Sequence, residues 1–176
     1  VTGNCIKIIK FLVENEPQLI GTQFGVLRLL RILDTLRTAD QRSAMHCISS
    51  MYGYNLTPEI AEYIPKLCLM LNSTDKFLQK RAVASLSKMI PAMSDNTYKK
   101  EMMDPLQFFV MQEEDLSSLE SILGVMSESS KKVSFAQLII DCKFDFSRCL
   151  SEQFANKNKE IPNKVLNLLL NIFPPA

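Results

Sequence analysis

The chain of 176 residues is 47% hydrophobic and 22% charged, and its 20 basic and 19 acidic side chains leave a formal net charge of +1. This balance provides no overall electrostatic field for holding nucleic acid or an anionic membrane, so any electrostatic function must be local. The five cysteines form no CxxC pair and no apolar run is long enough to cross a bilayer. These features predict reduced thiols in an intracellular protein, cytoplasmic or nuclear.

Apolar residues recur at three- and four-residue steps from the start of the chain onward, a spacing that predicts helices. A first helix ends near Asn15–Pro17, because proline lacks a backbone donor and disfavours helical backbone before it. A second helix covers residues 24–36 with Gly25 at its start, and Thr38–Asp40 form the break before a third that reaches about Tyr52.

The next stretch repeats this order of helices with clearer start signals. Thr57 is placed to cap a short helix, Pro58 suits its first position and Glu59 complements the positive end of the helix dipole. A medium helix opened by Pro65 follows, and then a long one at residues 75–91.

Two further units of three helices each are expected in the remaining sequence. The third comprises a short helix at Asp95–Met103, a medium one opened by Asp104-Pro105 and a long one at 113–126. The fourth comprises helices at Val133–Cys142, Phe144–Phe154 and Ile161–Phe173.

The first two long helices are near copies of each other. Four of six corresponding pairs, each 38 residues apart, are identical. The six pairs are Gln41 with Gln79, Arg42 with Lys80, Ala44 with Ala82, Ile48 with Leu86, Ser49 with Ser87 and Met51 with Met89. A repeat of this period predicts an all-α solenoid, because each helical unit must stack on its neighbours to bury its apolar face. The shared alanine permits close crossing of helices.

Three helices per unit, with Gly25 or Pro65 at a junction and a small residue in the long helix, resemble the armadillo repeat; the two-helix HEAT repeat is the near alternative. We therefore expect an armadillo-type, right-handed α-solenoid of about four repeats. It would span residues 1–176 as a single domain, and because the chain opens within a helical pattern we expect a fragment of a longer protein.

The segment from about Asn15 to Met93 carries a more particular resemblance. It contains Gln-Arg-x-Ala at 41–44, Leu-Thr-Pro-Glu at 56–59, Ile-Pro-x-Leu at 64–67 and Leu-x-x-x-Asp-Lys at 71–76. This combination resembles the armadillo region of HECT-type ubiquitin ligases of the ubiquitin-fusion-degradation class, which includes the thyroid-receptor-interactor ligases and their plant relatives. The resemblance implies a non-catalytic module that recruits substrates or ubiquitin, with the HECT domain elsewhere in the parent chain. It fades after Met93, which leaves a different armadillo parent open.

The armadillo resemblance also implies which residues bind. In such arrays the long helices line a concave groove, where the positions two and six residues after the small one face the partner. Here these positions are Lys7, Phe11, His46, Ser50, Ala84, Lys88, Ser121, Val125, Asn167 and Asn171, with Arg42 and Lys80 one turn earlier. Import receptors of similar fold repeat Trp and Asn there. This chain has no Trp and keeps only one such Asn, which argues against that function.

The groove positions of the first three units are basic, at Lys7, Arg42, His46, Lys80 and Lys88. Such a line predicts an acidic or phosphorylated segment in the partner, because these side chains form charge-assisted hydrogen bonds with carboxylate or phosphate. A solvated helix face without a ligand is the plainer interpretation and stays open.

Catalysis is not expected in this fragment. His46 and Cys47 are adjacent, but neighbouring helix positions diverge by about 100° and no third group orients the imidazole. With one His and no ligand spacing, no metal site and no cofactor are expected. The acidic run Glu113–Asp115 is explained by the dipole of a helix that begins there.

Two functions of different class stay open. The first is a protein-interaction module that recruits substrate or ubiquitin for a HECT-type ubiquitin ligase whose catalytic domain lies outside the fragment. The second is an armadillo or HEAT scaffold unrelated to ubiquitination. A HECT domain in the parent chain would favour the first and its absence the second.

Overall fold

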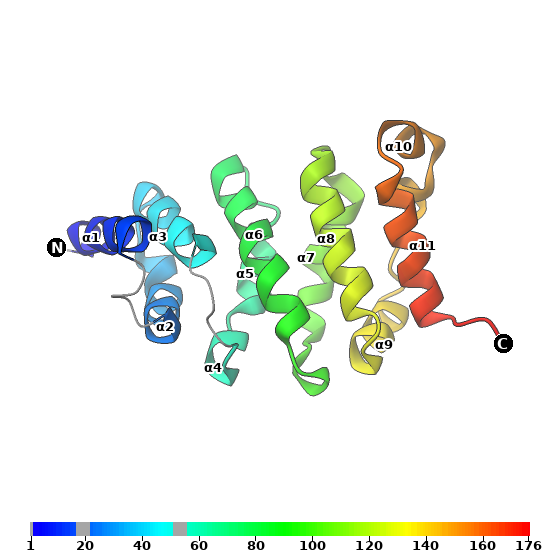
Figure 1. The fold of residues 1–176 in the computed structure, drawn as a ribbon, viewed down its shortest axis with the longest axis horizontal. Helices are drawn as coiled ribbons and strands as arrows, with labels where there is room; N and C mark the ends of the chain where they lie inside the picture. The colour runs from blue at the N-terminus through cyan, green and yellow to red at the C-terminus, as the bar shows by residue number, and fades with distance from the viewer. Residues whose placement is uncertain (1, 17–21, 51–55) are drawn as a thin grey trace.

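The protein is an all-helical array whose helices stack along one long axis (Figure 1). The structure, a computed structural model, describes residues 2–16, 22–50 and 56–176, and within these ranges every regular element is an α or 3-10 helix. The all-α prediction is confirmed, and the arrangement is consistent with an α-solenoid or helical-repeat fold. The expected end of the third helix near Tyr52 lies outside the described residues.

Five helices form a row from one end of the molecule to the other: α1 (Thr2–Asn15), α3 (Thr38–Ser50), α6 (Lys76–Ala92), α8 (Leu116–Ser129) and α11 (Glu160–Ile172). Each packs against the next, so that α3, α6 and α8 have a neighbour on both sides (Figure 1). We call these five helices the long-helix row. Ala44 and Ala82, the small residues of two inner helices, are completely buried, as close crossing of helices requires.

A second set of helices packs behind this row. It includes α2 (Thr22–Ile32) against α3, α5 (Ile64–Met70) against α6 and α7 (Met103–Gln112) against α8. Helices α4 (Pro58–Ala61), α9 (Val133–Asp141) and α10 (Glu152–Lys157) complete the array. The start of α4 is as predicted: the Thr57 hydroxyl oxygen accepts the backbone N–H of Ile60 at 3.3 Å, and Pro58 is the first helical residue.

One hydrophobic core runs through the array, from Val26 on α2 to Leu168 on α11. Its largest buried side chains include Phe109 of α7 and Phe135 of α9. Because the long helices contribute their buried faces to this shared core, their opposite faces form a continuous exposed side of the row.

The boundaries near Thr38 and Asp95 differ from the prediction. Helix α3 begins at Thr38, so the expected break at Thr38–Asp40 is its first turn. The expected short helix from Asp95 is two 3-10 turns, η3 (Asp95–Thr97) and η4 (Lys100–Met102), separated by extended backbone at Tyr98. The extended residue is held by its ring, which packs with its centroid 4.9 Å from that of Phe135.

The expected helix at Phe144–Phe154 is also divided, into the 3-10 turn η5 (Ser147–Leu150) and α10. The Asp145 carboxylate accepts hydrogen bonds from the backbone N–H and the hydroxyl of Ser147 at 2.9 and 2.6 Å. Such local side-chain hydrogen bonds compete with the helical ladder and favour a turn.

Side chains from later parts of the chain bind carbonyl groups in the last turn of an earlier long helix. Three nitrogen atoms donate in this way: Lys88 Nζ to the Ser49 oxygen at 2.5 Å, Lys132 Nζ to the Pro91 oxygen at 2.8 Å, and Asn171 Nδ2 to the Ser127 oxygen at 3.0 Å. The last four carbonyls of a helix have no intrahelical backbone partner, so these contacts help to satisfy them; the Ser127 carbonyl also accepts the Ser130 hydroxyl at 2.6 Å.

Candidate protein-binding face

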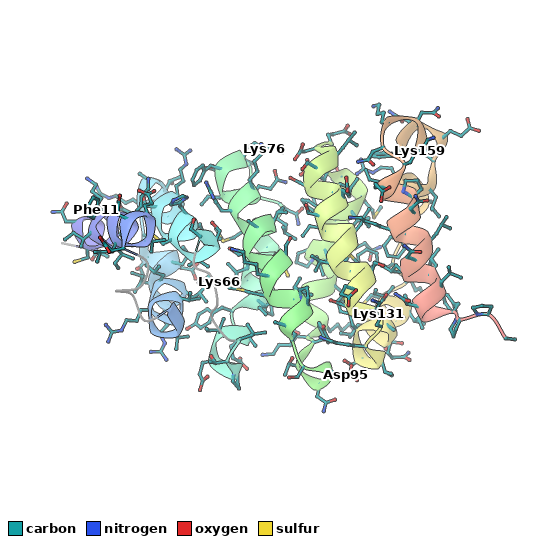
Figure 2. All side chains as sticks on the ribbon, in the orientation of Figure 1. Phe11, Lys66, Lys76, Asp95, Lys131 and Lys159 are labelled. Carbon is teal, nitrogen blue, oxygen red and sulfur yellow. The ribbon has the colours of Figure 1, made fainter. Side chains whose placement is uncertain are left out.

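The exposed side of the long-helix row carries the residues predicted to bind a partner. Eight of them are exposed and three, His46, Ser50 and Ala84, are half-buried; the exposed ones are Lys7, Phe11, Arg42, Lys80, Lys88, Ser121, Asn167 and Asn171. Val125 is an exception, because it is buried and belongs to the core, so its predicted groove position is wrong. Figure 2 shows the side chains, with Phe11 labelled on α1 at one end of the row.

Four of the predicted residues meet in one hollow between α6 and α8, which we call the α6–α8 hollow. Its volume is about 520 Å³, and it is lined from α6 by Lys80, Val83, Ala84, Ser87 and Lys88 and from the start of α8 by Asp115, Ser117, Ser118 and Ser121. The remaining predicted residues lie along α1, α3 and α11 on either side of it. The structure therefore concentrates the predicted set at the junction of two inner helices.

The α6 wall of this hollow carries two lysines. Lys80 and Lys88 lie eight residues apart on one face of α6. Lys88 donates to the Ser49 oxygen at 2.5 Å, and partial burial lowers its pKa. The α6 wall is therefore cationic, with one lysine already anchored to the preceding helix.

The α8 wall carries hydroxyl groups and one carboxylate. Asp115 caps α8, and its Oδ2 accepts the hydroxyl and the backbone N–H of Ser118 at 2.6 and 3.2 Å. The hydroxyl bond is the main reason that the pKa of Asp115 lies below its usual range, and the charges of Lys80 and Lys76 act in the same direction. Donors and acceptors thus face each other across the hollow, an arrangement suited to polar groups of a peptide chain.

Two members of the predicted basic line already have acidic partners. Arg42 Nε and Nη2 both lie 2.7 Å from Oδ2 of Asp75. On the same face, His46 Nε2 lies 2.9 Å from Glu14 Oε1. The basic line is therefore not uniformly available to a partner, and its cationic character is greatest at the α6–α8 hollow.

The surroundings of Cys47 do not favour it as a nucleophile with His46 as its base. Cys47 is buried, and this burial is the main cause that raises the pKa of its thiol to about 11, with the charge of Glu14 adding to the effect. A thiol with such a pKa is protonated at neutral pH, whereas the thiolate is the nucleophile. Among the described residues no group of three or more His, Cys, Asp or Glu side chains is placed to hold a metal ion.

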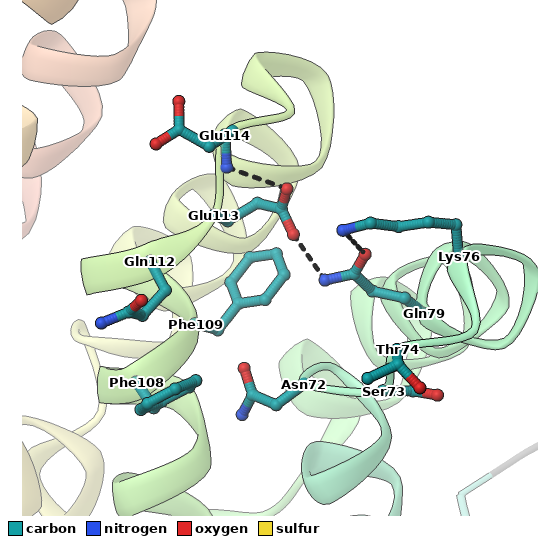
Figure 3. A pocket seen from close by; sticks show the side chains of 10 residues that line it. All are labelled: Asn72, Ser73, Thr74, Lys76, Gln79, Phe108, Phe109, Gln112, Glu113 and Glu114. Atoms are coloured by element: carbon teal, nitrogen blue, oxygen red, sulfur yellow. Dashed lines mark hydrogen bonds between the residues drawn. The ribbon is translucent and has the colours of Figure 1, made fainter.

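A second hollow of about 380 Å³ lies beside the start of α6 and the end of α7, and we call it the Gln79 pocket (Figure 3). Gln79 Nε2 donates to the Leu71 oxygen at 2.7 Å and to Glu113 Oε2 at 2.5 Å. Lys76 Nζ donates to the Gln79 Oε1 at 2.9 Å. Figure 3 shows Phe108 and Asn72 on the opposite side of this pocket from Lys76.

Glu113 has a different role from the one expected for it. Helix α8 begins at Leu116, and Glu113 lies before it with only 6% of its surface exposed. Its Oε1 accepts the backbone N–H groups of Glu114 and Asp115 at 2.9 and 2.8 Å. The carboxylate therefore binds loop N–H groups and Gln79. It does not stand at the first residue of a helix, where its charge would interact with the helix dipole.

Sequence reasoning missed several residues that line the two hollows. Val83, Ser87 and Asp115 of the α6–α8 hollow lie outside the positions counted for the groove, because the count followed single helices and the hollow is formed by two. The recurrence of glutamine at 41 and 79 was a usable signal. Gln41 Nε2 donates to the Leu33 oxygen at 3.1 Å, the same eight-residue contact that Gln79 makes with Leu71.

No protein-family model matches the chain, and no curated protein matches its sequence. Among solved structures, a crystal structure of an engineered protein is similar, with a TM-score of 0.66 and 16% sequence identity over 97% of this chain and 72% of that one. At this identity the similarity shows the helical fold alone. Among the described residues, no helix combines the length and apolar character needed to cross a membrane.

Proposed function

We propose that this chain is a non-catalytic protein-interaction module that holds an extended segment of a partner protein across the exposed side of the long-helix row. The observation that carries the proposal is the α6–α8 hollow, in which Lys80, Ala84, Lys88 and Ser121 come together. Armadillo arrays of about four repeats bind extended peptides on such a face, and the row of stacked helices supports that repeat type here.

The chemistry of the hollow favours a partner segment with acidic or phosphorylated side chains. Lys80 and Lys88 supply charge-assisted donors from one wall. Ser117 supplies a hydroxyl from the other wall for main-chain groups or phosphate oxygens, whereas the Ser121 hydroxyl donates to the Ser117 carbonyl at 2.9 Å and offers its oxygen to a main-chain N–H. Because Asp115 stands on the same wall, the anionic group of the partner belongs next to α6.

The resemblance of residues 15–93 to HECT-type ligases supports a further step of the same proposal. The partner is then a substrate or ubiquitin, recruited for an E3 ubiquitin ligase whose HECT domain lies outside these 176 residues. The buried Cys47 does not suit a catalytic role, which supports placing the chemistry elsewhere.

The test is a binding measurement with the purified chain. Fluorescence anisotropy is followed as the chain is titrated into labelled ubiquitin and into labelled peptides in phosphoserine, glutamate and serine versions of one sequence. The proposal requires the charged peptides to bind more tightly than the serine version. Equal affinity for all three versions, or no binding to any peptide or to ubiquitin, would overturn it.

A matched pair of variants then locates the site. Ala84→Gln fills the hollow from a half-buried position without changing its charge, whereas Leu69→Gln places the same side chain at an exposed position of α5 behind the row. The proposal requires that Ala84→Gln weakens binding and that Leu69→Gln does not. Equal effects of the two variants would mean that the partner does not use the hollow.

A further inference from the structure

The Gln79 pocket combines a buried carboxylate with an exposed aromatic ring (Figure 3). Glu113 lines the pocket and is 6% exposed, whereas Phe108 lines it and is 54% exposed. The first lies in the loop before α8 and the second on α7. At about 380 Å³ the pocket falls within the range of roughly 300–1,000 Å³ that ligand sites occupy. It is therefore large enough to hold a long side chain of another molecule.

The Glu113 carboxylate can accept one more hydrogen bond than it receives. A carboxylate offers about four acceptor positions. Oε1 uses two of them for the backbone N–H groups of Glu114 and Asp115, and Oε2 uses one for Gln79 Nε2. The remaining position therefore belongs to Oε2, the oxygen that Gln79 holds at the pocket.

The three donors are neutral amides, so the charge of Glu113 has no cation in direct contact. None of the ion pairs that form within 4.0 Å among the described residues includes Glu113. Lys76 lines the same pocket, but its Nζ donates to the Gln79 Oε1 at 2.9 Å. Arg148 binds the backbone oxygen of Glu113 at 2.6 Å and not its carboxylate. Because a buried charge is normally paired, a cation brought by a ligand would complete this site.

The charge of the whole pocket is also complementary to a cation. Its charged lining residues are Glu113, Glu114 and Lys76, so two carboxylates outweigh one lysine. The Glu114 side chain is 88% exposed, and its Oε1 lies 3.7 Å from Arg148 Nη1, a separation that leaves the carboxylate accessible. Charge complementarity therefore favours a cationic occupant over an anionic one.

The other side of the pocket suits a flat cation. Phe108 offers an aromatic ring, on which a guanidinium stacks through cation–π attraction. Asn72 Nδ2 donates to the Pro105 oxygen at 3.0 Å, so its Oδ1 is the atom of that amide that can accept from a ligand. Phe108 and Asn72 lie across the pocket from Lys76 (Figure 3). An arginine, with five donors in one plane, can use the ring and the separate acceptors together, whereas a lysine is a compact point charge.

We propose that the Gln79 pocket binds the arginine side chain of a protein partner. The guanidinium stacks on Phe108 and donates to Glu113 Oε2 and to Asn72 Oδ1. This site does not depend on binding in the α6–α8 hollow, because the two hollows share no lining residue. Failure of one therefore leaves the other standing.

Lys76 competes with the incoming cation and gives the proposal a variant that should gain affinity. Its side chain is exposed, and it stands in the first turn of α6, where a positive charge is unfavourable to the helix dipole. Lys76→Met keeps the apolar stem and removes the charge, so the helix should be retained. We expect the variant to bind an arginine probe more tightly than the unmodified chain.

Nuclear magnetic resonance titration with capped tripeptides tests the proposal. The probes are Gly-Arg-Gly, the same peptide with neutral citrulline in place of arginine, and the same peptide with lysine. The signals to follow are the side-chain amide of Gln79 and the backbone amide of Glu114, both of which contact the Glu113 carboxylate. The arginine probe should shift both signals saturably. The citrulline probe should bind about tenfold more weakly, because it lacks the charge-assisted and cation–π contributions.

Two pairs of matched variants locate the binding. Phe108→Leu keeps an exposed apolar side chain but removes the ring, and it should weaken binding of the arginine probe. Phe11→Leu makes the same change at the 61% exposed Phe11 of α1 and should have no effect. Lys76→Met should strengthen binding, whereas Lys100→Met, at an exposed position of η4, should not. These four positions are exposed, so circular dichroism is expected to show the unmodified helical content for each variant.

Glu113→Gln removes the charge and keeps the shape, and it should abolish the preference for arginine over citrulline. If this buried variant does not fold, the Phe108 and Lys76 variants still decide. Four results would overturn the proposal: no shift of the two signals with the arginine probe, equal affinity for citrulline, tighter binding of the lysine probe, or an affinity unchanged or lowered by Lys76→Met.

Discussion

Arg42 of α3 and Asp75 at the start of α6 form an ion pair in which two guanidinium nitrogens lie 2.7 Å from one carboxylate oxygen. The other oxygen of Asp75 accepts the backbone N–H groups of Phe77 and Leu78 at 3.0 and 3.2 Å and so caps α6. A residue predicted to bind a partner therefore joins two neighbouring helices of the row. This carboxylate serves both the junction and the helix start.

The first prediction concerns the stability of the fold at low pH. The hydrogen bond from Arg42 is the main reason that the pKa of Asp75 lies below its usual range. Because the folded-state pKa is the lower one, the stabilisation is present above the unfolded-state pKa of about 4 and is lost as pH falls through the folded-state value. We expect Asp75→Asn, which keeps a capping side chain, to lose less thermal stability on acidification than the unmodified chain. Parallel curves of unfolding temperature against pH would contradict this.

The second prediction concerns the small residue of α6. Ala82 is completely buried at a helix crossing, whereas Ala84 lines the hollow and is half-buried. Ala82→Leu is expected to lower the free energy of unfolding by about 1–3 kcal/mol through overpacking. Ala84→Leu should cost little, because its side chain extends into open space. Urea denaturation measures both, and equal losses would mean that the assignment of faces on α6 is wrong.

The third prediction concerns Gln79. Truncation by Gln79→Ala leaves the Leu71 carbonyl and one oxygen of the buried Glu113 without this donor, and we expect a loss of about 1–3 kcal/mol in the free energy of unfolding. Gln41→Ala removes the corresponding bond to the Leu33 oxygen. That bond lies at a part-buried site and involves a carbonyl group only, without a buried carboxylate such as Glu113. The loss in the free energy of unfolding should therefore be smaller for Gln41→Ala than for Gln79→Ala. Urea denaturation measures both, and equal losses would contradict the prediction.

The fourth prediction concerns the charge of the hollow. Lys80→Glu with Lys88→Glu is expected to weaken binding of an acidic or phosphorylated peptide strongly, and binding by the unmodified chain should weaken with salt. The control is Arg31→Glu with Lys100→Glu, two exposed positions on α2 and η4 outside the long-helix row. Equal losses of affinity in both variants would assign the effect to net charge. Because Lys88 also contacts Ser49, thermal unfolding of each variant must accompany the titration.

The fifth prediction concerns thiol reactivity. Cys5 is exposed and Cys142 partly so, whereas Cys47, Cys68 and Cys149 are buried. Burial raises the pKa of Cys68 to about 12, which leaves very little thiolate at neutral pH. A chromogenic disulfide reagent should therefore react with Cys5 and Cys142 in the native chain and with all five residues only after unfolding. Fast reaction of Cys47 in the native chain would contradict the packing of α3.

The sequence predicted the helices well wherever one periodic stripe decides the structure. The 3.6-residue period identifies the buried side of α6 and α11, and Thr57-Pro58 marks a helix start because the capping chemistry is local. The period fails at Asp95–Met102, where Tyr98 takes an extended backbone to reach Phe135 on a later helix. No local pattern contains that contact.

The candidate site shows the same limit. Counting from Ala82 correctly placed Lys80, Ala84 and Lys88 on the exposed side of α6, because one helix fixes their direction. The opposite wall depends on α8 starting at Leu116 after an Asp115 cap, whereas the acidic run suggested a start at Glu113. The partners of Arg42 and Glu113 likewise come from neighbouring helices, so they follow from the stacking and not from spacing along the chain.

The hydrogen bonds from Lys88, Lys132 and Asn171 to carbonyls at the ends of α3, α6 and α8 all run from a later segment to an earlier helix. In each case the later segment completes the end of the earlier helix, and the three carbonyls belong to Ser49, Pro91 and Ser127. The ends of α3, α6 and α8 therefore depend on segments that follow them in the chain, whereas the start of α6 depends on Arg42 of the earlier helix α3. Detachment of α11 removes the Asn171 contact at the end of α8 and leaves the Ser127 carbonyl with the Ser130 hydroxyl, which donates to it at 2.6 Å, whereas detachment of α1 removes none of these three bonds.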